Sequence, residues 1–77
     1  MTTASTTTLD ARGLNCPLPI LKTKKALSGL HSGDTLTVIA TDPGSVKDMT
    51  AFCSQTGHAL IDSAEEQGDY TFVIQKS

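Results

Sequence analysis

The chain is 77 residues long, has a formal net charge of −2 and is 38% hydrophobic, with two Phe, one Tyr and no Trp. This length holds one domain, which must use nearly all of its apolar residues for a single core. A weakly acidic chain lacks the basic field that attracts nucleic acid or anionic membranes, and so few aromatic residues make a poor platform for base stacking. We therefore expect no direct nucleic-acid binding and no membrane association.

The amino-terminal segment 1–8 is rich in Thr and Ser and contains neither a basic region nor an apolar run. This composition differs from that of a signal peptide, and no stretch of the chain approaches the length of a membrane span. We expect residues 1–7 to be a flexible terminus, residues 8–77 to form the single domain, and the protein to be cytoplasmic. In a reducing compartment Cys16 and Cys53 are expected to be free thiols.

The first half of the domain predicts a strand, a helix and a second strand. Apolar and polar residues alternate over Thr7–Arg12, which predicts a short strand that ends at Gly13. Apolar residues at helical spacing predict a helix from Pro17 to Leu30, with a turn after it. The β-branched and alternating segment Thr35–Thr41 predicts the second strand.

The second half predicts a helix and two more strands. Asp42 is expected to cap the helix with Pro43 in its first turn, and Gly57 to end it. Its apolar stripe consists of Val46, Met49, Phe52 and Cys53. Strands are expected over His58–Ala64 and Asp69–Lys76, joined by the polar hairpin segment Glu65–Gly68.

The predicted order βαβαββ defines the fold class as α/β (α+β), a two-layer sandwich. Such an order folds most simply as a four-stranded mixed sheet with two helices on one face. The first connection from strand to helix, residues 13–16, lies at the carboxyl end of a strand. Open α/β sheets usually place their sites at this edge.

That connection ends in Cys16-Pro17-Leu18-Pro19, which places one thiol at the start of a helix. We expect Cys16 to be the N-cap and Pro17 the first helical residue, since proline is favoured there. The positive end of a helix lowers the pKa of a nearby thiol. Pro19 removes one backbone donor, which leaves a thiolate more nucleophilic. The alternative is an inert, packed Cys16 that continues the apolar stripe Ile20, Thr23, Leu27 and Leu30.

Other residues with chemical potential have plainer explanations. Cys53 falls on the stripe of the second helix, which favours a packing role over a role as partner of Cys16. The two Cys residues are not arranged as Cys-x-x-Cys, so the usual dithiol motif is missing. A zinc site is disfavoured because the Cys and His residues lack the usual ligand spacing. We expect no metal and no cofactor.

Charged residues flank the Cys16 segment on both sides. Lys22, Lys24 and Lys25 are candidates for docking an acidic partner, although a solvated helix face explains them equally well. Asp10 and Arg12 either orient a group near the thiol or form a surface ion pair of little energetic weight.

The run from Leu9 to Pro19, Leu-Asp-Ala-Arg-Gly-Leu-Asn-Cys-Pro-Leu-Pro, resembles the TusA-like (SirA-like) sulfur-carrier family. The resemblance extends over residues 8–76 and includes the lysine-rich helix and the later segment Thr41–Gly44. It implies a two-layer fold and a persulfide carried on Cys16. The family pattern assigns site-shaping or supporting roles to Pro17, Pro19, Asp10, Gly13 and Leu14, and Arg12 lies in the same run.

The resemblance also implies partners. The donor would be a cysteine desulfurase or a rhodanese-type protein, and the acceptor would serve tRNA 2-thiouridylation, molybdenum-cofactor assembly or sulfur oxidation. This is sulfurtransferase-type chemistry, and a carrier is not expected to turn over without its partner enzymes. Two alternatives remain: a regulatory protein-binding module that uses the lysine face, and a redox switch that pairs Cys16 with Cys53.

Overall fold

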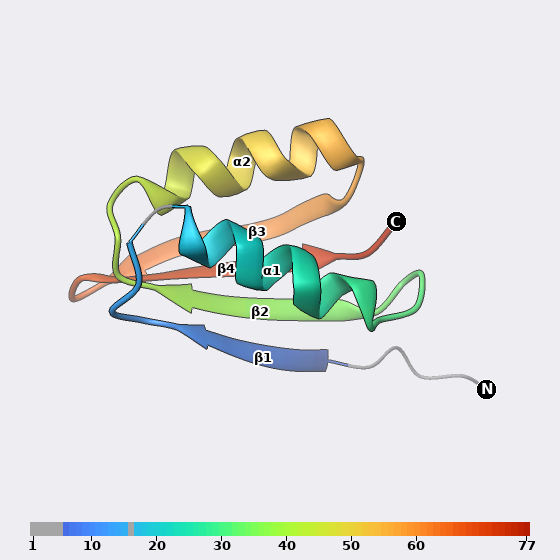
Figure 1. The fold of residues 1–77 in the computed structure, drawn as a ribbon, viewed down its shortest axis with the longest axis horizontal. Coiled ribbons are helices and arrows are strands. Elements are labelled where there is room, and N and C mark those ends of the chain that lie inside the picture. The colour runs from blue at the N-terminus through green and yellow to red at the C-terminus, as the bar shows by residue number, and fades with distance from the viewer. Residues whose placement is uncertain (1–5, 16) are drawn as a thin grey trace.

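The computed structural model describes residues 6–15 and 17–77. Its elements are β1 (Thr6–Ala11), α1 (Leu18–Ser28), β2 (Thr35–Ala40), α2 (Ser45–Thr56), β3 (Ala59–Glu66) and β4 (Asp69–Gln75) (Figure 1). The predicted order βαβαββ is confirmed. The first strand starts and ends one residue earlier than predicted, because Thr6 pairs with Thr35 at the start of β2.

The four strands form one mixed sheet in the order β1-β2-β4-β3. β1 runs parallel to β2, and the other neighbouring pairs are antiparallel. Both helices lie on one face of this sheet (Figure 1), as predicted. The parallel pair places the ends of β1 and β2 at the same edge, and the loop toward α1 leaves from there.

The core lies between the two central strands and the helices. Strands β2 and β4 contribute alternate residues that are fully buried: Leu36, Val38, Ala40, Phe72 and Ile74. α1 buries Pro19, Thr23 and Leu27, and α2 buries Ser45, Met49 and Cys53. The Thr23 hydroxyl donates to the Pro19 carbonyl at 2.8 Å, so this buried polar group is satisfied within its own helix.

The start of α1 differs from the prediction. Pro17 occupies the N-cap position, no side chain caps the helix, and the helix begins at Leu18 rather than at Pro17. Pro19 is then in the first turn, where an amide donor has no intrahelical acceptor and proline is tolerated. The first helical hydrogen bond runs from Leu21 N–H to the Pro17 carbonyl at 3.1 Å. Cys16, predicted as the N-cap, lies outside the described residues.

The start of α2 also differs. The N-cap is Gly44, and Asp42 acts before the helix: its Oδ1 accepts the Gly44 N–H at 3.0 Å. Its carbonyl accepts the N–H and the hydroxyl of Ser45 at 2.9 and 2.6 Å. The buried line of α2 therefore starts at Ser45, and Val46 is 38% exposed, contrary to the predicted stripe.

The β3–β4 hairpin is tighter than predicted, because β3 extends to Glu66 and leaves only Gln67 and Gly68 as the connection. Both of these residues have positive φ, 53° and 86°. This pair of angles matches a type I′ turn, whose twist suits antiparallel strands. The pairing of β3 shifts between Leu60 and Asp62.

Across residues 6–15 and 17–77, no helix combines the length and the apolar character needed to cross a membrane.

Candidate functional site at the loop between the first strand and helix

The loop between β1 and α1 is fixed by hydrogen bonds on both sides of residue 16. On the strand side, Leu14 N–H donates to the Ala11 carbonyl at 3.3 Å. On the helix side, Leu18 N–H donates to the Asn15 carbonyl at 2.9 Å. The backbone that flanks Cys16 in sequence is thus held by the ends of β1 and α1, while Cys16 itself is not among the described residues.

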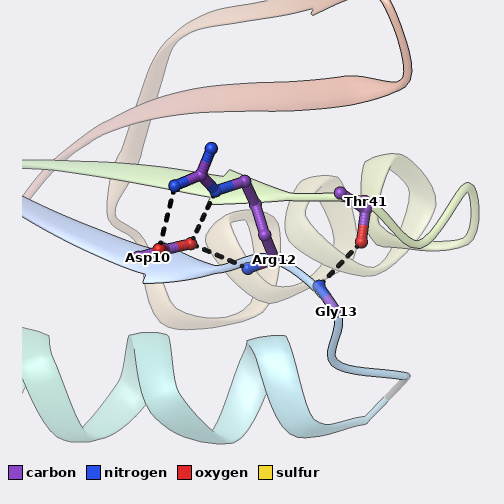
Figure 2. A network of polar contacts seen from close by, with 4 residues as sticks. All are labelled: Asp10, Arg12, Gly13 and Thr41. Carbon is purple, nitrogen blue, oxygen red and sulfur yellow. Dashed lines mark hydrogen bonds and ion pairs between the residues drawn. The ribbon is translucent and has the colours of Figure 1, made fainter.

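Gly13 shapes this loop through its backbone angle. Its φ is +80°, a left-handed conformation that side chains strongly disfavour, although open space surrounds the position of a Cβ atom. Its N–H donates to the hydroxyl oxygen of Thr41 at 2.9 Å (Figure 2). Since Thr41 follows β2 directly, the bond joins the two loops that leave the parallel strands at the same edge.

Asp10 and Arg12 form an exposed ion pair at the end of β1 (Figure 2). Arg12 Nε donates to Asp10 Oδ1 at 2.9 Å, Nη2 donates to Oδ2 at 3.1 Å, and the Arg12 backbone N–H donates to Oδ1 at 3.0 Å. These bonds lower the pKa of Asp10 to about 2 and raise that of Arg12. Of the two predicted roles, the structure shows the surface ion pair, and such pairs contribute little to stability.

The remaining predicted site-shaping residues differ in burial. Leu14 is half-buried against the core, and Pro19 is fully buried in α1. Pro17 is exposed. The structure therefore separates a packing proline from a surface proline next to Cys16.

A shallow apolar groove of about 260 Å³ begins at Pro17 and lies between the helices. Its lining residues are Pro17, Ile20, Asp48, Ala51, Phe52 and Gln55. The groove is not among the sites predicted from the sequence. The α2 residues that line it lie on one face of the helix, but Asp48 and Gln55 are polar, so no apolar pattern in the sequence marks this face.

Apolar side chains and lysines share the exposed surface of α1. Leu18 is 46% exposed and Leu21 is 55% exposed, and helical spacing places these two large apolar side chains one turn apart on the surface. Lys22, Lys24 and Lys25 are also exposed. Helical spacing places Lys22 and Lys25 one turn after Leu18 and Leu21, so charge and apolar surface are adjacent.

Cys53 packs in the core, as predicted. It is 4% exposed, and burial raises the pKa of its thiol because the thiolate loses solvation. A buried thiol with a raised pKa is a poor nucleophile. Cys53 is a free thiol in the structure. The alternative of a redox switch that pairs it with Cys16 stays a hypothesis, because Cys16 lies outside the described residues.

Within the described ranges, 6–15 and 17–77, the His, Cys, Asp and Glu side chains form no group of three that could hold a metal ion.

Several known proteins are similar to this chain. Residues 7–76 match the family described as sulfurtransferase TusA. The sulfur carrier protein TusA of Allochromatium vinosum is 62% identical over 69 residues, covering 90% of this chain and 91% of the relative. A putative sulfur carrier protein of Neisseria meningitidis serogroup A is 57% identical over 68 residues, covering 88% and 92%.

A solved structure extends the similarity to the fold. The crystal structure of a SirA-like protein from Desulfitobacterium hafniense matches with a TM-score of 0.80 and 27% identity, covering 90% of this chain and 95% of that one. The match along nearly the whole domain and the shared fold show that this chain belongs to the sulfurtransferase TusA family.

Proposed function

We propose that this protein is a sulfur carrier that receives sulfane sulfur on Cys16 as a persulfide and passes it to an acceptor protein. The observation that carries the proposal is the family match over residues 7–76, which spans the Cys-Pro-Leu-Pro segment. The hydrogen bonds on both sides of residue 16 support it, because a carrier needs its thiol presented by a defined backbone.

The proposed loading step is a thiol exchange without net oxidation. The Cys16 thiolate attacks the terminal sulfur of a donor persulfide, R–S–SH, and forms a new S–S bond. The donor S–S bond breaks, and its electron pair leaves with the donor sulfur as a thiolate. Unloading repeats the step, with an acceptor thiolate attacking the terminal sulfur on Cys16. The carrier itself needs no metal and no cofactor for this chemistry.

We further propose that partners dock on the groove and the exposed surface of α1 beside it. The apolar lining beside Pro17 and the exposed Leu18 and Leu21 favour a partner that offers apolar side chains. Lys22, Lys24 and Lys25 favour acidic groups around those side chains. A partner bound there would lie against the residues that flank Cys16.

The proposed donor is a cysteine desulfurase or a rhodanese-type protein in the cytoplasm. The proposed acceptor belongs to a relay toward tRNA 2-thiouridylation, molybdenum-cofactor assembly or sulfur oxidation. These partners follow from the family, and no described residue selects among the pathways.

Intact-mass spectrometry tests the carrier. The reduced protein is incubated with a cysteine desulfurase and cysteine, or with a rhodanese and thiosulfate, beside the variants Cys16→Ser and Cys53→Ser. We expect one added sulfur atom, removable by reductant, on wild type and on Cys53→Ser. Cys16→Ser should gain none, because an alcohol cannot form a persulfide.

Two results would contradict the proposal: no sulfur uptake from either donor, or uptake by Cys16→Ser. Docking is tested separately by Leu21→Asp, with Ile61→Asp as the control at a similarly exposed apolar residue on β3. The first should raise the donor concentration needed for half-maximal loading, and the second should not.

A further inference from the structure

We propose that Thr41 is a positioning residue for sulfur transfer, acting through its hydrogen bond to the Gly13 amide. The inference rests on the proposed function and adds a residue to it. Thr41 lies outside the loop that carries Cys16, and its role is to orient that loop rather than to touch the sulfur.

The hydrogen bond from Gly13 to Thr41 spans a longer distance in the sequence than the neighbouring hydrogen bonds of the loop. Arg12 N–H and Leu14 N–H both donate to acceptors in β1, at Asp10 and Ala11. Gly13 N–H donates to Thr41, 28 positions later in the sequence. Local bonds shape the turn, whereas a long-range bond fixes where the turn lies relative to the rest of the molecule.

The sheet supplies a rigid support for Thr41. The preceding residue, Ala40, is fully buried and pairs with Ala11, the last residue of β1. The hydrogen bond to the Thr41 hydroxyl is therefore one further contact between the two chain segments, just beyond the paired residues of β1 and β2. Gly13 donates this hydrogen bond with its φ at +80°, a conformation that turns the chain away from β1 (Figure 2).

Because the loop is exposed, an effect of Thr41 on the orientation of the loop can be distinguished from an effect on the stability of the fold. Gly13 is exposed, so its N–H can bond to water when the Thr41 hydroxyl is removed. The loss should therefore affect the free energy of unfolding weakly, since no buried donor is left unpaired. The freed loop should sample more orientations, and misorientation of a nucleophile lowers the rate of the bond-forming step.

The test compares Thr41→Val, which removes the hydroxyl at similar volume, with Thr41→Ser, which keeps it. Thr37→Val is the matched control, because it removes a hydroxyl from β2, the strand that leads to Thr41, at a position paired with Thr8 and Val73. Sulfur loading is followed by intact mass over a range of donor concentrations. The rate of amide hydrogen exchange at Gly13 reports whether its hydrogen bond to Thr41 is formed.

For Thr41→Val we expect faster exchange at Gly13 and a maximal loading rate lower by about two- to tenfold, the factor of one neutral hydrogen bond. The half-saturating donor concentration should stay the same. Thr41→Ser should restore both the exchange and the rate, and Thr37→Val should match wild type.

A Thr41→Val protein that loads at the wild-type rate overturns the inference, as does one whose Gly13 amide exchanges as slowly as in wild type. A rate that Thr41→Ser fails to restore also overturns it. Wild-type protein that takes up no sulfur contradicts the proposed function instead, so the two failures are distinguishable.

Discussion

The ammonium group of Lys76 lies 2.6 Å from the carbonyl oxygen of Leu30, just beyond the end of α1. The same group lies 2.7 Å from the Leu27 carbonyl. The backbone of Lys76 also bonds to the turn before β2, donating to the Asp34 carbonyl and accepting from Gly33 N–H. The residue after β4 therefore caps the carboxyl end of α1 with a positive charge, which opposes the partial negative charge there.

Replacing Lys76 with Met should lower the free energy of unfolding by about 1–2 kcal/mol, because two partly buried charge-assisted hydrogen bonds are lost while the aliphatic stem is kept. Chemical denaturation measures the change. Lys47→Met, on the exposed surface of α2, is the control and should change stability little. Equal effects of the two substitutions would argue against a capping role for Lys76.

The type I′ turn at Gln67 and Gly68 is open to stabilisation. Among the described residues, Gln67 is the one non-glycine residue with positive φ. Asn adopts a positive φ at a lower cost in conformational free energy than Gln does. Gln67→Asn should raise the free energy of unfolding by a few tenths to about 1 kcal/mol. The same substitution at Gln55, inside α2, should lower it slightly through helix propensity. A melting temperature that falls for Gln67→Asn would refute the turn assignment.

The ion pair at the end of β1 predicts a shifted titration. Arg12 lowers the pKa of Asp10 from 3.8 to about 2. Any stability from this shift is present above the ordinary pKa and is lost as the pH falls toward about 2. Because both side chains are exposed, solvent screens the ion pair, and we expect only a small loss of stability over that range.

Carboxyl chemical shifts measured by NMR should give Asp10 a titration midpoint below its ordinary value of 3.8. Arg12→Gln should bring the midpoint back toward 3.8. If the midpoint does not respond to Arg12→Gln, the ion pair is not the cause of the shift.

Burial predicts that Cys53 resists alkylation in the folded protein. Its thiol is almost inaccessible, and burial disfavours the reactive thiolate. In native Cys16→Ser, iodoacetamide at neutral pH should leave the mass unchanged. After unfolding in denaturant, the same variant should gain one modification. Rapid native alkylation would show that Cys53 is available for chemistry and would revive the redox-switch alternative.

The sequence by itself determined the order of elements and the class of the fold. Alternating residues in Thr35–Ala40 and helical spacing in α1 and α2 are local patterns, and the structure confirms them because burial of one face enforces the same periods. The Cys53 packing role and the family were also predictable, the first from its place on an apolar stripe and the second from the segment that ends in Pro19.

The tertiary structure decided what depends on partners distant in sequence. Local propensity placed a cap at Cys16 and at Asp42, whereas the helices begin after Pro17 and Gly44. The groove exists because two helices lie side by side on one face. The bond from Gly13 to Thr41 and the cap from Lys76 to Leu30 join segments 28 and 46 residues apart. Contacts of this kind are set by the pairing of strands and the packing of layers, which no local pattern specifies.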